Sequence, residues 1–197
     1  MPYAARFDMS ISAHHVAAEL RRRLGKDPGV VKVHKLLYYL QGWHLTWAGE
    51  PLFRERIEAW TNGPVVADLW HDEKKDRPRP PAQLLTGEQL ATVDYVVERY
   101  GRQTGRELIR QTHNEDPWRE ASEADAAGWG TENPEIDHQA LRRWFENDEE
   151  YLARTAETER PPHADVDMFA PLEITDELEA AVARAVNGER VRHSRPA

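Results

Sequence analysis

The stretch that decides the fold is VVKVHKLLYYLQGWHLTWAG, residues 30–49. Its apolar side chains recur every three or four residues, so they lie along one wide face of an α-helix. These side chains are Val33, Leu36, Leu37, Leu40, Trp43 and Trp47. Gly49 is suited to end the helix because glycine readily adopts the left-handed conformation. The pattern predicts a helix at about residues 31–48, in the centre of a domain.

Shorter elements are expected on both sides of this helix. Ser12 is a plausible N-cap for a helix that Gly25 ends. Residues 53–59 alternate between apolar and charged side chains, which indicates a short extended segment. Asn62 and Gly63 predict a turn, and Pro64 is expected in the first turn of a following helix.

The second half of the sequence carries further helix signals. Thr86 with Gln89 and Thr104 with Glu107 fit the capping box, in which the two side chains cap the start of a helix together. THNEDPW, residues 112–118, is expected to form a turn followed by a loop. Asp137 is expected to cap the helix that carries Leu141, Trp144 and Phe145.

These signals predict a mainly α fold with a small β element (α+β), as a compact multi-helix domain over residues 10–150. Residues 151–197 are expected to form a polar linker, a short helix that Thr175 caps, and a basic tail. A length of 197 residues agrees with one domain and an extension.

Composition excludes several classes of protein. The net charge of −9 opposes general binding of nucleic acid, although a local basic patch is compatible with it. The sequence has no cysteine, no apolar run long enough to cross a membrane and no signal peptide at its start. We therefore expect a cytoplasmic protein.

No motif for catalysis, a metal or a cofactor stands out. His34 and His44 are ten residues apart on the predicted helix, too far to bind one ion together. No serine has the context of a nucleophile elbow, and no glycine loop fits a phosphate. His113, near Glu115 and Asp116, is the best local cluster; a cationic imidazole capping a helix end is favoured over partner contact or catalysis. We predict no catalytic residue, metal or cofactor.

Four segments together resemble one known family. They are KLLYYLQGWHLTWAGEPLF (35–53), IEAWTNGPVV (57–66), THNEDPWREA (112–121) and ALRRWF (140–145). In this order they resemble the Panacea (SocA-like) antitoxin domain over about residues 31–147. The family often has an aromatic residue where this chain has Thr61 and Asn62.

The resemblance implies a mainly helical antitoxin that neutralises a separately encoded cognate toxin by direct contact. One branch of the family is understood to present its toxin to a AAA+ protease, and other members are phage-borne. The alternatives are therefore a proteolytic adaptor or a regulatory protein of a phage or mobile element, with an enzyme least favoured.

Candidate partner-binding residues come from the motifs and from the excess of aromatic side chains. Some of these aromatics pack in a core, but exposed Trp and Tyr are enriched in binding hot spots. Gln41 is either a hydrogen-bonding group at the rim of such a site or a buried, satisfied one. The candidates are Tyr39, Gln41, Trp43, Trp60, Asn62, Gly63, Pro64, His113 and Trp118.

Two further features allow a role in binding. Residues 114–159 contain fourteen Asp or Glu and four Arg or Lys, which indicates either a solvated surface or an acidic face that covers a basic toxin. The predicted helix after Thr175 is a candidate for insertion into a groove of the partner. The arginines near the end of the chain are a weaker candidate for contact with nucleic acid.

Overall fold

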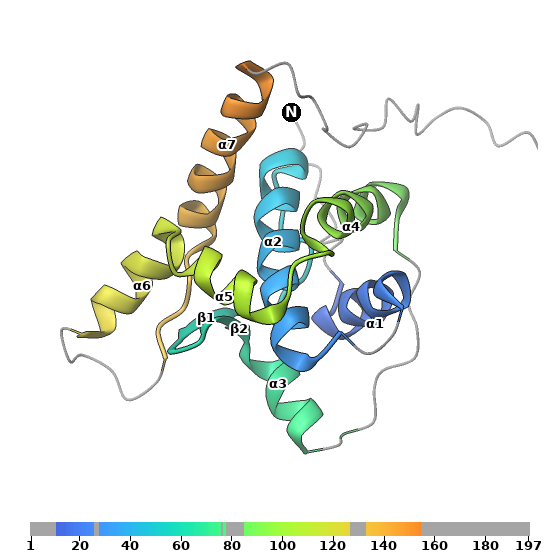
Figure 1. Cartoon of the computed structure of the whole chain (residues 1–197), viewed down its shortest axis with the longest axis horizontal. Coiled ribbons are helices and arrows are strands. Elements are labelled where there is room, and N and C mark those ends of the chain that lie inside the picture. The colour runs from blue at the N-terminus through green and yellow to red at the C-terminus, as the bar shows by residue number, and fades with distance from the viewer. Residues whose placement is uncertain (1–10, 26–27, 76, 78–84, 127–132, 155–197) are drawn as a thin grey trace, which may run out of the picture. The chain divides into compact units, whose positions relative to one another are not determined.

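The computed structural model describes residues 11–25, 28–75, 77, 85–126 and 133–154. Within these ranges the chain forms seven helices and one two-stranded antiparallel sheet (Figure 1), so the predicted mainly α fold with a small β element is confirmed. The helices are α1 (Ala13–Leu24), α2 (Val30–Ala48), α3 (Ala67–Lys74), α4 (Gly87–Tyr100), α5 (Gly105–Thr112), α6 (Asp116–Ala126) and α7 (His138–Arg154); the strands are β1 (Ile57–Trp60) and β2 (Gly63–Val66). The predicted linker, helix and basic tail lie outside the described residues, except for the last residues of α7.

Helix α2 is the centre of the core, as its sequence predicted. All its residues from Val33 to Leu45 are buried. It contacts α1, α4, α5, α7 and β2, and Figure 1 shows it between α4 and α7. A helix buried on every side needs neighbours on every side, so α2 organises the other elements.

Aromatic rings join α2 to the helices around it. Tyr39 stacks on Tyr100 of α4 with 4.1 Å between ring centroids. Phe145 of α7 makes edge-to-face contacts with Tyr38, Tyr39 and Trp43. Edge-to-face and offset-stacked rings are the favoured arrangements of buried aromatics.

The helix ends follow the predicted caps. Ser12 caps α1, Gly49 adopts the left-handed conformation after α2, and Asp137 accepts hydrogen bonds from two backbone N–H groups at the start of α7. Both capping boxes form: Thr86 caps α4 and Thr104 caps α5.

The prediction for Pro64 was wrong, because Pro64 lies in β2 and the helix begins at Ala67. Strands β1 and β2 form a hairpin in which Pro64 is opposite Ala59. The N–H of Ala59 points away from β2 and donates to Pro134 O at 2.8 Å. Ala59 and Pro64 therefore form a non-hydrogen-bonded pair of the ladder. Proline, which has no N–H, is accommodated at such a position.

The prediction of a turn and loop after Thr112 was also wrong in part, because α6 occupies Asp116–Ala126. Pro117 lies in the first turn of this helix, where its missing N–H is not needed. The pattern was hard to read because α6 has few apolar residues; Trp118 and Ala121 are the ones that pack against the core.

Candidate functional site

Several half-exposed aromatic side chains meet around the β1–β2 hairpin. Trp118 Nε1 of α6 donates a hydrogen bond to Trp60 O at 3.1 Å. The rings of His113 and Trp118 stack with centroids 4.0 Å apart, and Trp60 contacts Trp70 of α3 edge to face at 4.9 Å. Asn62, at the hairpin loop, is exposed. We call this set the hairpin surface: Trp60, Asn62, Trp70, His113 and Trp118.

A buried lysine of α2 contacts the hairpin from the core side. Lys35 of α2 is 1% exposed, and its Nζ donates to Pro64 O at 2.8 Å. Gly63 has φ of 88°, and a Cβ there would lie 2.9 Å from both Lys35 Cε and Thr112 Oγ1. The close contact with Lys35 and the positive φ both require glycine at this position. Lys35 and Gly63 thus hold the hairpin against α2 and α5.

Burial changes the ionisation of the groups below the hairpin. It lowers the pKa of Lys35 to about 7. It also lowers the pKa of His34 to about 3, with the charge of Lys35 contributing, and His34 Nδ1 accepts a hydrogen bond from Val66 N at 3.3 Å. His34 is therefore neutral at physiological pH and serves as an acceptor.

His113 does not take the cationic role that its position suggested. Burial and the neighbouring Lys35 lower its pKa, so the neutral imidazole is favoured at pH 7. It follows the last turn of α5, but its main contact is the stack on Trp118. His113 is the C-cap residue of α5, as its position predicted, but the charged form of this cap is disfavoured because the ring is partly buried near Lys35.

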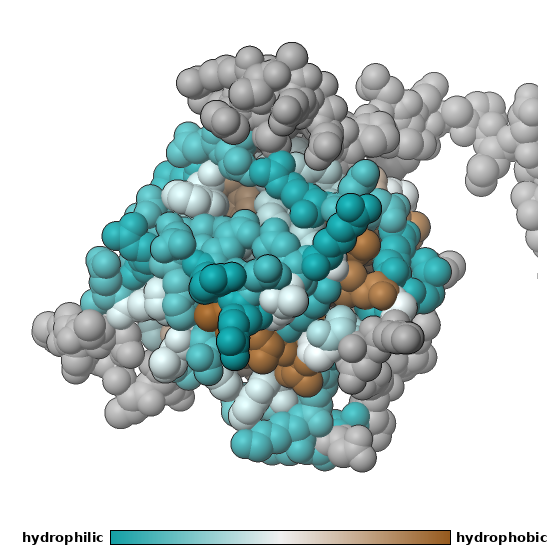
Figure 2. Space-filling view, viewed as in Figure 1, coloured by the Kyte–Doolittle hydropathy of each residue, from teal (hydrophilic) through white to brown (hydrophobic). Residues whose placement is uncertain are grey.

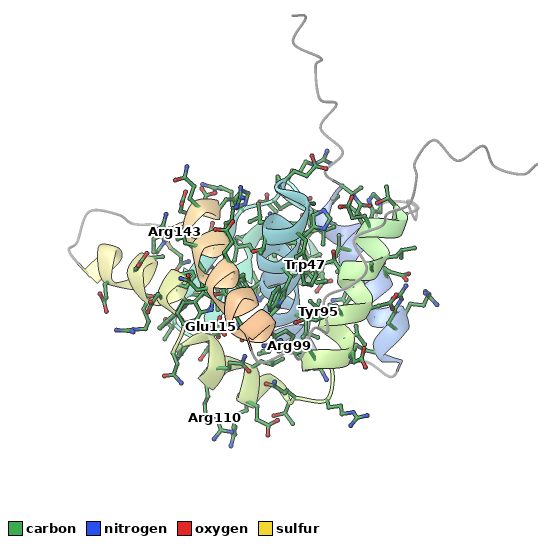
Figure 3. The ribbon with its side chains drawn as sticks, turned by 90° about the horizontal axis from the view of Figure 1, so that it is seen from above. Trp47, Tyr95, Arg99, Arg110, Glu115 and Arg143 are labelled. Atoms are coloured by element: carbon green, nitrogen blue, oxygen red, sulfur yellow. The ribbon has the colours of Figure 1, made fainter. Side chains whose placement is uncertain are left out.

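An acidic cleft of about 540 Å³ adjoins the other side of the α5–α6 turn. It includes Glu115, Asp116 and Asp148, together with Arg99 of α4 and aromatic residues of α7. Figure 3 shows Arg99 and Glu115 beside α7. Arg99 is already held by Asp148 at 2.9 Å and by Tyr95 Oη at 2.7 Å. Carboxylates therefore exceed cations in the cleft.

Glu115 is the buried carboxylate of this cleft. It is 5% exposed, and its Oε1 accepts a hydrogen bond from Tyr39 Oη at 2.8 Å. Burial raises its pKa to about 7, although hydrogen bonding to neighbouring side chains acts in the opposite direction. Glu115 thus changes charge within the physiological pH range.

The segment from His113 to Trp118 connects the two features. His113 and Trp118 belong to the hairpin surface, whereas Glu115 and Asp116 belong to the acidic cleft. One short turn between α5 and α6 therefore positions side chains at both.

A wider cleft of about 900 Å³ lies near α1 and α3. Its charged lining is balanced in sign, with Arg54, Lys75 and Arg77 on one side of the balance and Glu55, Asp68 and Asp72 on the other. Asp72 contacts His14 Nε2 at 3.4 Å and Arg77 at 2.8 Å, and Glu55 accepts a hydrogen bond from Ser12 at 2.6 Å. This balance leaves the wider cleft without a concentrated charge for a ligand.

The structure separates the predicted site residues into two groups. It brings Trp60, Asn62, Gly63, Pro64, His113 and Trp118 together at the hairpin. It places Tyr39, Gln41 and Trp43 in the core, with exposures of 1%, 0% and 0%.

The three core residues have structural contacts and offer no surface to a partner. Gln41 is the buried, satisfied amide: Oε1 accepts from Leu52 N and Phe53 N, and Nε2 donates to Phe53 O. Trp43 Nε1 donates to Tyr100 Oη at 3.2 Å. The expectation of direct partner contact is therefore corrected for these three, because a helix surrounded on all sides buries its side chains. Gly63 and Pro64 are also buried, so at the hairpin they shape the backbone and offer little surface themselves.

The sequence did not single out Trp70 or Lys35. It drew attention to Glu115 only as a neighbour of His113, and not as a buried carboxylate. Trp70 reaches the hairpin surface from α3, a contact between elements that no local pattern reports. Lys35 lies outside the apolar stripe of α2, so the apolar periodicity contained no signal that it is buried.

No group of three or more His, Cys, Asp or Glu residues in the described ranges is arranged to hold a metal ion. Among the same residues, no helix has both the length and the apolar character needed to cross a membrane.

Residues 33–119 match the model of one protein family, described as "Antitoxin SocA-like, Panacea domain". The match runs from the first turns of α2 into α6 and includes every residue of the hairpin surface. The resemblance inferred from the sequence motifs is thus confirmed for these residues. No curated protein and no solved structure matches the chain.

Proposed function

Taking the antitoxin SocA-like Panacea domain of residues 33–119 as the premise, we propose that this protein is an antitoxin that neutralises a cognate toxin protein by direct binding. The family match is the observation that carries the proposal. It supports an antitoxin role in general, and the surface described above supports binding as the means.

The hairpin surface is the proposed centre of contact. Trp60, Trp70 and Trp118 are each partly exposed, and a hydrogen bond or a ring contact holds each of them in place. A rigid aromatic group loses little conformational entropy on binding and buries a large apolar area. Such a group is suited to a stable protein–protein contact.

Acidic side chains beside this surface favour a basic partner. Asp116, Glu120 and Glu123 are exposed on α6 and spaced by four and three residues, so they share one side of the helix. Arg119 pairs with Asp116 at 3.2 Å, whereas Glu120 and Glu123 form no ion pair with a described residue. Together with the acidic cleft, they provide a negative field for a toxin that carries positive charge to act on nucleic acid.

The proposal includes no catalytic step. The buried ionisable groups have structural partners: Glu115 binds Tyr39, Lys35 binds Pro64 O and His34 binds Val66 N. These contacts organise the core and the hairpin, which agrees with a binding protein.

The first test is genetic and biochemical. A small neighbouring reading frame that kills cells when expressed, and is rescued by this protein, identifies the toxin. We expect the two purified proteins to form a stable complex. Rescue that requires a AAA+ protease, with no stable complex, would overturn direct blocking in favour of delivery to the protease.

The second test locates the contact. Asn62→Arg places a long charged side chain at the exposed hairpin loop, and we expect it to weaken the complex at least about tenfold, equivalent to about 1.4 kcal/mol. Ala18→Arg introduces the same residue at an exposed position of α1 and is the matched control. Equal affinity of both variants for the toxin would remove the hairpin from the interface.

A further inference from the structure

A second exposed patch lies where α2 begins, next to α5. Val30 and Val31 are 46% and 45% exposed, and they are the large hydrophobic residues classed as exposed in the described part of the chain. Arg102, Arg106 and Arg110, from the α4–α5 loop and α5, are also exposed. We call these five residues the arginine–valine patch.

The fold brings these residues together through two contacts. Lys32 Nζ donates to Gly101 O at 2.6 Å, which ties the first turn of α2 to the α4–α5 loop. A Cβ on Gly105 would lie 3.4 Å from Val31 Cγ1, so the start of α5 lies against Val31. The other side of α5 buries Leu108 and Thr112, which leaves Arg106 and Arg110 directed outward.

The patch keeps an excess of positive charge within the described residues, although the Glu107 carboxylate interacts electrostatically with Arg110. None of the three arginines forms an ion pair there. Glu107, the acidic residue between Arg106 and Arg110, uses its carboxylate to accept hydrogen bonds from Thr104 N and Thr104 Oγ1. The patch is thus a concentration of positive charge on a protein whose net charge is −9.

The surface view agrees with this arrangement. Figure 2 shows hydrophobic atoms next to strongly hydrophilic ones over the α2–α5 region of Figure 1, and Figure 3 shows Arg110 pointing away from the ribbon. Exposed apolar side chains next to arginines are a composition found in protein-binding surfaces.

We propose that the arginine–valine patch binds an acidic protein segment that also carries apolar side chains, from a partner other than the toxin. The arginines select carboxylates, which they can bind in a bidentate manner. The two valines give apolar side chains of the segment a contact that a phosphate backbone does not use. The acidic net charge further disfavours nucleic acid as the occupant.

This inference goes beyond the proposed antitoxin function, because the patch and the hairpin surface share no residue. The hairpin surface consists of β1, hairpin-loop, α3 and 113–118 side chains, whereas the patch consists of residues 30–31 and 102–110. A protein that holds a basic toxin with one surface therefore has a second surface of opposite charge for an acidic protein.

The test is selection of peptides from a random display library on the full-length chain. Peptides are kept if they bind the wild-type chain and not the double variant Arg106→Glu/Arg110→Glu. We expect the selected peptides to be rich in Asp and Glu and to contain Leu, Ile, Val or Phe. They should bind the Val31→Ser variant at least about fivefold more weakly than the wild-type chain, a difference of about 1 kcal/mol. Arg143→Glu, a reversal at an exposed arginine of α7, should leave their binding unchanged.

A duplex DNA probe in the same assay separates the alternative. If the DNA binds the wild-type chain more tightly than the peptides do, and the double variant no longer binds it, the patch is a nucleic-acid surface and the proposal is overturned. Selection of no peptides, or of peptides without an acidic bias, would also overturn it. Circular dichroism checks that the variants remain folded, and toxin neutralisation should be unaffected by all of them.

Discussion

At the scale of single residues, Glu115 and Tyr39 show how the core and the surface are coupled. The carboxylate is buried against the ring hydroxyl of a core residue, yet it lies in the wall of the acidic cleft. Burial raises the pKa of Glu115 from 4.5 to about 7. A protonated Glu115 can remain in place at low cost, whereas its carboxylate is penalised by the loss of solvation.

Glu115→Gln tests this coupling through the pH dependence of stability. Between pH 4.5 and 7 the unfolded chain has lost the Glu115 proton while the folded chain retains it, so this residue makes stability fall as pH rises. Glutamine keeps an acceptor for Tyr39 and does not titrate. We expect the variant to gain on the order of 2–3 kcal/mol relative to wild type between about pH 5 and pH 7.5, as measured by urea unfolding.

The stability of the variant must be compared with that of wild type at each pH, because His34 changes the stability of both proteins with pH. Its effect is opposite to that of Glu115 and falls in an overlapping pH range. Its lowered pKa makes stability rise with pH between about 3 and 6.5, and this contribution is the same in both proteins. The difference in unfolding free energy between the variant and wild type should change between about pH 5 and pH 7.5. If it is the same at both, Glu115 is not buried as described.

At the scale of elements, the crossing of α2 and α7 depends on one glycine. A Cβ on Gly42 would lie 2.1 Å from Phe145 Cε2, so the two helices approach closely only because position 42 has no side chain. Phe145 in turn contacts the rings of Tyr38, Tyr39 and Trp43. Moving α7 outward would therefore loosen the aromatic core.

Gly42→Ala is expected to lower the free energy of unfolding by about 1–3 kcal/mol, the usual cost of overpacking a core, despite the better helix propensity of alanine. Gly87→Ala is the matched control, because nothing lies within 4 Å of a Cβ at that position in the first turn of α4. Denaturant unfolding of both variants measures the effect. Equal stability of the two would contradict the close packing of α2 on α7.

At the scale of the whole molecule, charge is distributed unevenly. The chain has a net charge of −9 and an acidic cleft near the hairpin surface, yet the arginine–valine patch is positive. Surfaces of opposite sign attract partners of opposite sign and speed their encounter. This distribution supports two binding partners of different character.

The rate of toxin association tests the acidic part of this distribution. We expect the rate constant to fall as salt rises, because salt screens the attraction between separated charges. Glu120→Lys on α6 should slow association several-fold at low salt. Glu98→Lys, an equal charge change at an exposed position of α4, should have a smaller effect. Association rates that do not depend on salt would rule out electrostatic steering.

The sequence by itself determined the features that depend on neighbours along the chain. The period of apolar residues identified α2 and its central position, and Thr86, Thr104 and Asp137 identified three helix starts. A cap or an amphipathic face is formed by residues within a few positions of one another, so their spacing is sufficient to predict it. The motifs also indicated the family whose model matches residues 33–119, and most residues that meet at the hairpin.

Only the tertiary structure decided which of those residues reach the surface. Tyr39, Gln41 and Trp43 belong to the family motifs, as Trp60 does, yet residues of α4, α7 and the segment 52–53 bury the first three, whereas Trp60 is half-exposed. Pro64 can lie in a strand because Ala59, the residue opposite it, donates its N–H to Pro134 O and not to β2. Pro134 is seventy positions beyond Pro64 in the sequence. Burial and strand pairing depend on residues far apart in the chain, which is why local patterns predicted most of the helices but not the exposed face.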